Sequence, residues 1–152
     1  MANFVYNRGK YLTGIIDATA TTWRVMLLTT GYTSDDAHNT VDDGTTADPA
    51  SYEIAVGGYA RQSMALSAFE DDTNDFAGLD SPDKTFSALA AGATIGWAVV
   101  YRYSTSGGTT SDTGQDLLAA YTLTATPTNG GDITIQWAST SAGGVLKLAS
   151  TS

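Results

Sequence analysis

Hydrophobic and polar side chains alternate along several segments of the chain, and this alternation predicts β-strands. The clearest segment is residues 94–103. Two sets of side chains alternate there: Trp97, Val99, Tyr101 and Tyr103 in one, and Ala98, Val100 and Arg102 in the other. Because successive side chains of a strand point to opposite sides, the first set defines one face and the second set the other.

Residues 23–29 form a nearly continuous apolar run, Trp-Arg-Val-Met-Leu-Leu-Thr. A short run of this kind is typical of a strand that is buried on both faces. The remaining pattern predicts strands at residues 59–66, 84–89, 117–125, 131–138 and 145–148.

The sequence between two of these segments predicts a hairpin. Residues 117–125 and 131–138 both alternate, and Pro127-Thr128-Asn129-Gly130-Gly131 separates them. Asn-Gly favours a tight turn because both residues tolerate a positive φ. We therefore expect residues 117–125 to pair with residues 131–138.

The N-terminal segment has a different pattern. Phe4, Val5, Leu12, Ile15 and Ile16 have nearly helical spacing, and Asn3 could cap a helix. We predict a short helix over residues 3–16, weakened by its two glycines, with an ordered arm as the alternative. Residues 1–22 would form this helix or arm, and residues 23–152 a single β domain.

These elements predict an all-β fold, a β-sandwich or open β-barrel of about six to eight mostly antiparallel strands. The composition agrees, with 24 threonines, which favour strands, and 16 glycines, which favour turns. The 152 residues suit one domain, and 42% hydrophobic residues supply a core.

Acidic residues gather in two polar segments. Residues 30–51 hold five aspartates in a stretch too long for a tight turn, and residues 70–75 read Glu-Asp-Asp-Thr-Asn-Asp. An EF-hand loop starting at Asp71 would need Gly at its sixth position and Glu at its twelfth, and the chain has Phe76 and Pro82 there. The second segment is interpreted as a solvated acidic turn, with another type of calcium site as the alternative.

The charge balance restricts the partners. Seven basic and 16 acidic residues give a net charge of −9, which opposes binding to nucleic acid or to an anionic membrane. The N-terminus has no secretory signal pattern, and no apolar stretch reaches the length of a membrane span.

Few residues offer catalytic chemistry. The chain has no cysteine, and its one histidine, His38, lies in the acidic segment, where we expect it to be exposed to solvent. No Gly-x-Ser-x-Gly elbow or phosphate-binding glycine loop is present. We therefore expect no enzyme activity, no cofactor and no metal. Trp97, Tyr101 and Tyr103 could line a glycan groove, but their spacing favours the core face of a strand.

Several stretches resemble small virion structural proteins of tailed bacteriophages. They are residues 6–14 followed by 23–28, residues 117–121 and 127–137, and the final strand at 145–148. The distinctive part is Pro-Thr-Asn-Gly-Gly-Asp-Ile-Thr, which indicates a fold and not a catalytic motif. The proteins it resembles are capsid decoration (cement) or accessory head proteins.

The resemblance implies a non-enzymatic protein that binds the outer surface of the major capsid shell and stabilises it. Such a protein is made in the host bacterial cytoplasm, and its negative charge suits the outside of a shell filled with DNA. The alternatives are a tail or neck component (tube, collar or fibre-base) and a receptor- or glycan-binding virion module.

The basic end of the chain is our candidate contact with the capsid or with a sister subunit. Its residues are Tyr6, Arg8, Lys10, Tyr11 and Arg24. We also expect a homo-oligomer, with a trimer favoured because symmetry must match a local axis of the shell. Two alternatives remain: an ordinary packed helix with solvated charges, or strand addition at a sheet edge.

Overall fold

The computed structural model describes residues 3–8, 22–104 and 111–149, and within them the chain is all-β. The strands are β1 (Asn3–Val5), β2 (Trp23–Thr29), β3 (Gln62–Met64), β4 (Ser67–Asp71), β5 (Phe76–Asp80), β6 (Lys84–Phe86), β7 (Thr94–Arg102), β8 (Leu117–Pro127), β9 (Ile133–Ile135) and β10 (Leu146–Ala149). Three short 3-10 helices accompany them: η1 (Pro49–Tyr52), η3 (Asp112–Gly114) and η4 (Thr140–Ala142). The predicted all-β class is confirmed, although these ten strands exceed the expected six to eight.

A five-stranded antiparallel sheet forms the centre of the molecule, in the order β1-β8-β7-β2-β3. β2 runs against β7 with Trp23 opposite Arg102 and Leu27 opposite Ala98. The strands predicted at residues 23–29 and 94–103 are therefore confirmed, the second to within one residue. Residues 59–66 contain only the shorter strand β3.

Both faces of the central sheet are buried, as the apolar run in β2 predicts. Trp23, Val25 and Leu27 belong to one hydrophobic cluster, and all three are fully buried. Met26 and Leu28, which alternate with them, belong to a second cluster on the opposite face.

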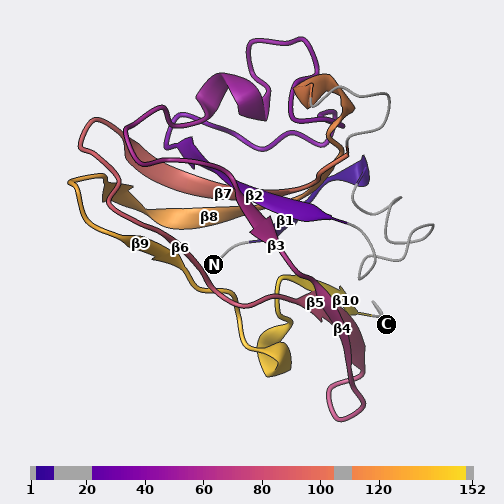
Figure 1. Ribbon diagram of the computed structural model, residues 1–152. Coiled ribbons are helices and arrows are strands. Elements are labelled where there is room, and N and C mark those ends of the chain that lie inside the picture. The colour runs from indigo at the N-terminus through magenta and orange to yellow at the C-terminus, as the bar shows by residue number, and fades with distance from the viewer. Residues whose placement is uncertain (1–2, 9–21, 105–110, 150–152) are drawn as a thin grey trace.

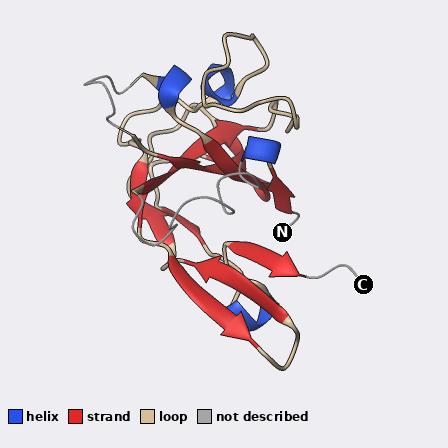
Figure 2. Ribbon diagram, turned by 90° about the vertical axis from the view of Figure 1, so that its right-hand side faces the viewer, coloured by secondary structure: helices blue, strands red, loops and turns tan. Residues whose placement is uncertain are grey.

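Two small sheets cover the first face: β10-β5-β4 and β6-β9. Figures 1 and 2 show them below the central sheet, while η1, η3 and long loops lie above it. Aromatic rings join the layers: Tyr121 of β8 meets Trp137 edge to face at 5.3 Å, and Tyr59 stacks on Phe86 of β6 at 5.9 Å.

The predicted hairpin is wrong, because β8 and β9 belong to different sheets. β9 pairs with β6, placing Ile133 opposite Phe86, and β8 pairs with β7 and β1. The Asn-Gly segment bonds to a distant loop instead: the Gly130 amide donates to the Leu89 carbonyl at 2.6 Å, and the Leu89 amide donates to the Gly131 carbonyl at 3.1 Å. These bonds direct the chain into the lower layer.

The helix predicted over residues 3–16 is wrong at its start. Asn3–Val5 form β1, with Asn3 opposite Tyr121 of β8, and the Tyr6 amide continues this pairing by donating to the Leu118 carbonyl at 3.2 Å. The edge of β8 offers unpaired backbone groups. Hydrogen bonds to these groups stabilise the N-terminal segment more than an isolated helical turn would, because a single turn is costly to nucleate. Asn7 and Arg8 are helical, as predicted, and residues 9–16 lie outside the described residues.

Candidate contact site

Tyr6, one of the predicted contact residues, is part of the core and not of the surface. Its side chain is fully buried, and its hydroxyl lies 2.5 Å from the hydroxyl of Tyr32. Burial raises the pKa of both hydroxyls, that of Tyr32 to about 12. Tyr32 covers this side chain, so Tyr6 does not offer the exposed surface that a contact residue needs.

Arg8 forms an ion pair at one end of the central sheet. Its Nε donates to Asp116 Oδ1 at 2.7 Å, and Arg102, the last residue of β7, donates to the other oxygen of the same carboxylate. Asp116 is nearly buried, with 7% of its side chain exposed. The shared carboxylate thus ties the N-terminal segment to the end of β7 and the start of β8.

Arg24, near the start of β2, lies at the same end of the sheet. Its guanidinium carbon is 3.6 Å from the centre of the Tyr103 ring, a cation–π contact. Arg24 forms no ion pair with any described residue, and its buried Nε has no hydrogen-bond acceptor there. The structure therefore brings Arg8 and Arg24 to one end of the sheet, while Lys10 and Tyr11 lie outside the described residues.

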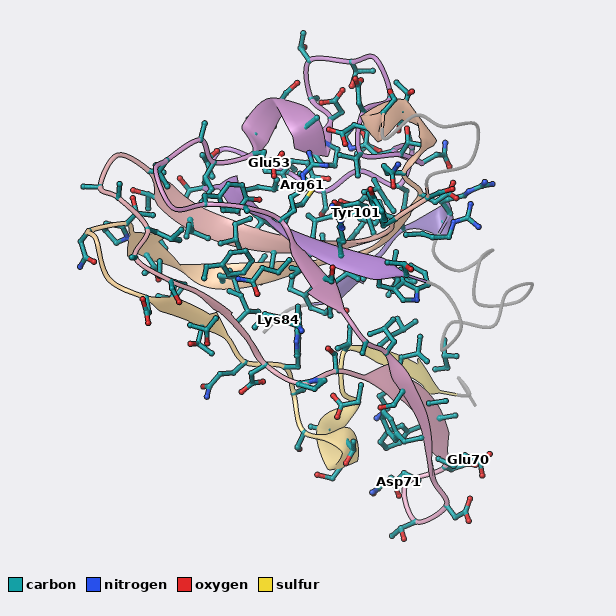
Figure 3. All side chains as sticks on the ribbon, viewed as in Figure 1. Glu53, Arg61, Glu70, Asp71, Lys84 and Tyr101 are labelled. Atoms are coloured by element: carbon teal, nitrogen blue, oxygen red, sulfur yellow. The ribbon has the colours of Figure 1, made fainter. Side chains whose placement is uncertain are left out.

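Arg61 joins three segments of the upper layer. Its Nε and one terminal nitrogen donate to the two oxygens of Glu53 at 2.8 and 2.5 Å, and its terminal nitrogens donate to Asp112 at 2.6 and 2.8 Å. Figure 3 shows Arg61 between Glu53 and Tyr101. Burial disfavours the charged guanidinium, yet the hydrogen bonds to Glu53 and Asp112 raise the pKa of Arg61 overall.

Tyr59 extends this network to the central sheet. Its hydroxyl donates to Glu53 at 2.6 Å and accepts from the Leu27 amide at 3.1 Å. The network escapes sequence reasoning because Glu53, Arg61 and Asp112 stand in three separate polar segments with no spacing that links them.

A pocket of about 190 Å³ lies between the two arginines, lined by Arg24, Arg61, Tyr101, Tyr103, Asp112 and Gln115. Its polar groups are already engaged: Asp112 binds Arg61, and the Gln115 side-chain oxygen accepts from the Ser104 amide at 2.8 Å. The Asp112 carboxylate holds the Arg61 guanidinium in place. Arg24 and the Tyr103 hydroxyl are the lining groups that form no hydrogen bond with a described side chain, so they are the groups that could receive an oxyanion.

His38 is buried, with 5% of the residue exposed, which corrects the expectation of a solvent-exposed histidine. Its ring stacks on Tyr32 with centres 6.4 Å apart, and its Nδ1 has no hydrogen-bond partner among the described residues. The sequence misleads here because a polar loop that folds onto the sheet buries the few side chains facing inward.

The aromatic side chains of β7 pack as the strand pattern predicts. Tyr101 is buried, Trp97 meets Tyr32 edge to face at 5.5 Å, and Trp97 and Tyr103 pack against the upper cluster. This packing confirms the core-face interpretation for Tyr101, whereas Trp97 and Tyr103 are only half-buried, and the glycan-binding alternative stays a prediction.

The acidic turn at residues 70–75 joins β4 to β5 and points away from the body of the molecule (Figure 3). The Asp71 carboxylate accepts from Thr73 and from Asn74, so it holds the turn itself. Among the described residues, no three histidine or carboxylate side chains are grouped so that they could bind a metal ion.

Comparison with protein-family models, with curated proteins and with solved structures found no significant match. Among the helices in the described part of the chain, none is long and apolar enough to cross a membrane.

Proposed function

We propose that the protein is a non-enzymatic structural component of a tailed bacteriophage particle, a decoration protein that binds the outside of the capsid shell. The sequence resemblance supports this role, and so does the net charge of −9, which is unfavourable beside packed DNA. The major capsid protein is the proposed partner, and a trimer is the proposed assembly.

The observation that carries the proposal is the environment of Arg24. In a strongly acidic chain, this guanidinium has no carboxylate partner among the described residues, although Arg8, Arg61 and Arg102 each have one. A carboxylate of a neighbouring protein would give Arg24 the ion-pair partner that it lacks among the described residues. The sheet end that also holds Arg8 is therefore the proposed contact with the shell or a sister subunit.

Binding to capsids tests this role directly. Purified protein is mixed with DNA-emptied heads that lack it, and the bound copies per head are counted by cryo-electron microscopy. A decoration protein covers the shell in many symmetric copies, whereas a tail or neck component binds at few positions. The absence of binding to the shell would refute the proposal.

A pair of charge variants tests the contact. Arg24→Gln should weaken binding about tenfold, equivalent to about 1.4 kcal/mol, because the partner carboxylate loses its guanidinium. Lys84→Gln removes the same charge from β6, where no ion pair with a described residue is formed, and should bind like the unaltered protein. Equal binding by both variants would exclude Arg24 from the contact.

A further inference from the structure

The loop above the central sheet carries an excess of negative charge. Residues 25–60 contain six carboxylates and neither lysine nor arginine. Of these six, Glu53 is the one that forms an ion pair within the described residues. The five aspartates of residues 30–51 therefore have no cation of their own chain beside them in the described structure.

A pocket of about 420 Å³ opens within this acidic loop. It is lined by Asp35, Ala37, His38, Asp43, Thr45 and Ala47. All of these residues are exposed except His38, which is buried among them. The pocket is therefore lined by exposed carboxylates together with one buried imidazole.

The hydrogen-bonding groups of this pocket are mainly acceptors. Asp35 Oδ1 accepts from the Ala37 amide at 2.9 Å, and no described residue donates to Oδ2. Asp43 accepts from the Asn39 amide and from the Thr40 hydroxyl. A neutral imidazole adds one further acceptor nitrogen, and His38 Nδ1 is buried without a partner in the described residues.

The field of these carboxylates extends into the protein. Burial is the main cause that raises the pKa of Tyr32, whose ring stacks on His38, to about 12. The hydrogen bond with Tyr6 lowers this pKa, and the charges of Asp35, Asp48 and Asp43 raise it further. The pocket is consequently complementary to a cation that can donate several hydrogen bonds.

The chemistry of the pocket selects among cations. A metal ion needs several ligands around one point, and the described histidine and carboxylate side chains form no group of three that could hold one. An ammonium group carries three rotatable donors on a thin stem, which suits separate acceptors around a pocket better than a planar guanidinium does.

We propose that this pocket binds the ammonium group of a lysine side chain on a partner protein. The inference deepens the proposed function, on which it rests for the partner's identity, because it assigns the acidic loop to a basic patch of the capsid shell. The protein would then contact its neighbours at two places of opposite charge: the Arg24 end of the sheet and the acidic loop.

The single histidine of the chain gives a direct readout. The ¹⁵N-labelled protein is titrated with Nα-acetyl-lysine methylamide at a pH where an ordinary imidazole is neutral, and the His38 ring resonances are followed by NMR. We expect a saturable shift. Asp35→Asn keeps the acceptor for the Ala37 amide but removes the charge, and should weaken binding about two- to fivefold.

Asp36→Asn is the matched control, since it removes the same charge from the neighbouring position, which does not line the pocket. It should bind like the unaltered protein. The side-chain-acetylated lysine derivative, which lacks the charge, should give no shift. Equal effects of the two variants, equal shifts with the acetylated derivative, no shift at all, or tighter binding of calcium than of the lysine compound would each overturn the proposal.

This titration and the capsid experiment fail independently. A negative titration would leave binding to emptied heads, and its dependence on Arg24, as evidence for the decoration role. A positive titration together with no binding to heads would keep the lysine pocket and reject the capsid as its partner.

Discussion

Both faces of the central sheet are apolar, but they are covered in different ways. Below the sheet, the backbone of the covering layer is paired in the regular ladders β10-β5-β4 and β6-β9. Above it, the covering layer is made of loops, and hydrogen bonds of side chains hold these loops in place. Arg61 joins Glu53 to Asp112, and Asp48 accepts from the Ser51 amide at the start of η1.

One hydrophobic sheet therefore depends on two kinds of interaction for its cover. The lower layer is held mainly by ring packing and by strand ladders, although two of the packed rings, Tyr59 and Tyr121, are phenols. The upper layer depends on charged and phenolic groups, so its stability should respond to pH and to charge substitutions.

The largest effect should come from the lower layer. Phe86 is 1% exposed and stacks on Tyr59. Phe86→Ala should reduce the free energy of unfolding by about 3–5 kcal/mol, because it removes a buried ring and leaves a cavity. Thr85→Ala, at the exposed neighbouring position, should cost less than about 1 kcal/mol. Chemical denaturation measures both, and similar losses would contradict the packing described for this layer.

Alkaline pH should destabilise the upper layer. Tyrosine in the unfolded chain ionises near pH 10.0, whereas the pKa of folded Tyr32 is raised to about 12. The unfolded state therefore loses this proton first, and the stabilisation, complete below pH 10, is lost as the pH rises through 12. For Tyr32 this amounts to about 2–3 kcal/mol.

Tyr32→Phe is the control for this pH dependence. Denaturation between pH 9 and 12 should show a smaller loss in this variant, because one of the raised phenols is absent. The pKa values of Tyr6, Tyr59 and Tyr121 are also raised by burial, so part of the loss should remain. An unchanged slope would show that Tyr32 does not contribute.

Replacing Arg61 should reduce the free energy of unfolding somewhat less, and its local effects should be confined to the upper layer. Arg61→Met leaves the carboxylates of Glu53 and Asp112 without their cation, and we expect a loss of about 1–3 kcal/mol because the group is 20% exposed. Hydrogen exchange should quicken at the Ile54 amide but not in β5. Lys84→Met should change little, and faster exchange throughout the protein would contradict the separation of the layers.

The smallest effect is expected at the exposed turn of the lower layer. The pKa of Asp71 is lowered, first by the hydrogen bond from the Asn74 side chain. Its contribution is therefore present above the ordinary pKa and is lost as the pH falls through the lower folded value. Asp71→Ala should speed exchange at the amides of Thr73 and Asn74, with little change in global stability. Asp72→Ala is the control. If both variants speed exchange equally, the hydrogen bonds to the Asp71 carboxylate are not what holds the turn.

The sequence predicts the strands better than their partners. β2 and β7 follow from their own residues, because alternation and apolar runs are local. The strand that pairs with β9 depends on the backbone hydrogen bonds between Leu89 and the Asn-Gly segment. These residues are distant in sequence, so no local pattern predicts the pairing. β5 (Phe-Ala-Gly-Leu-Asp) is not among the predicted strands, since a glycine inside so short a segment weakens the strand pattern. Its Gly78 is needed because a Cβ there would lie 2.5 Å from the Leu146 carbonyl oxygen.

The contact site was predictable only in part. The uneven charge indicates the N-terminal basic residues, and Arg8 and Arg24 do share one end of the sheet. Burial of Tyr6 and His38 was not predictable, since both depend on Tyr32, which belongs to a distant or irregular segment.

The strand order also has a consequence for synthesis on the ribosome. β2 must wait for β7, about 70 residues later, and β1 pairs with residues 119–121 of β8. The central sheet can therefore close only when most of the chain has emerged, and its many contacts distant in sequence favour slow folding. Until then the apolar face of β2 stays uncovered, so the nascent chain should be most vulnerable to aggregation late in its translation.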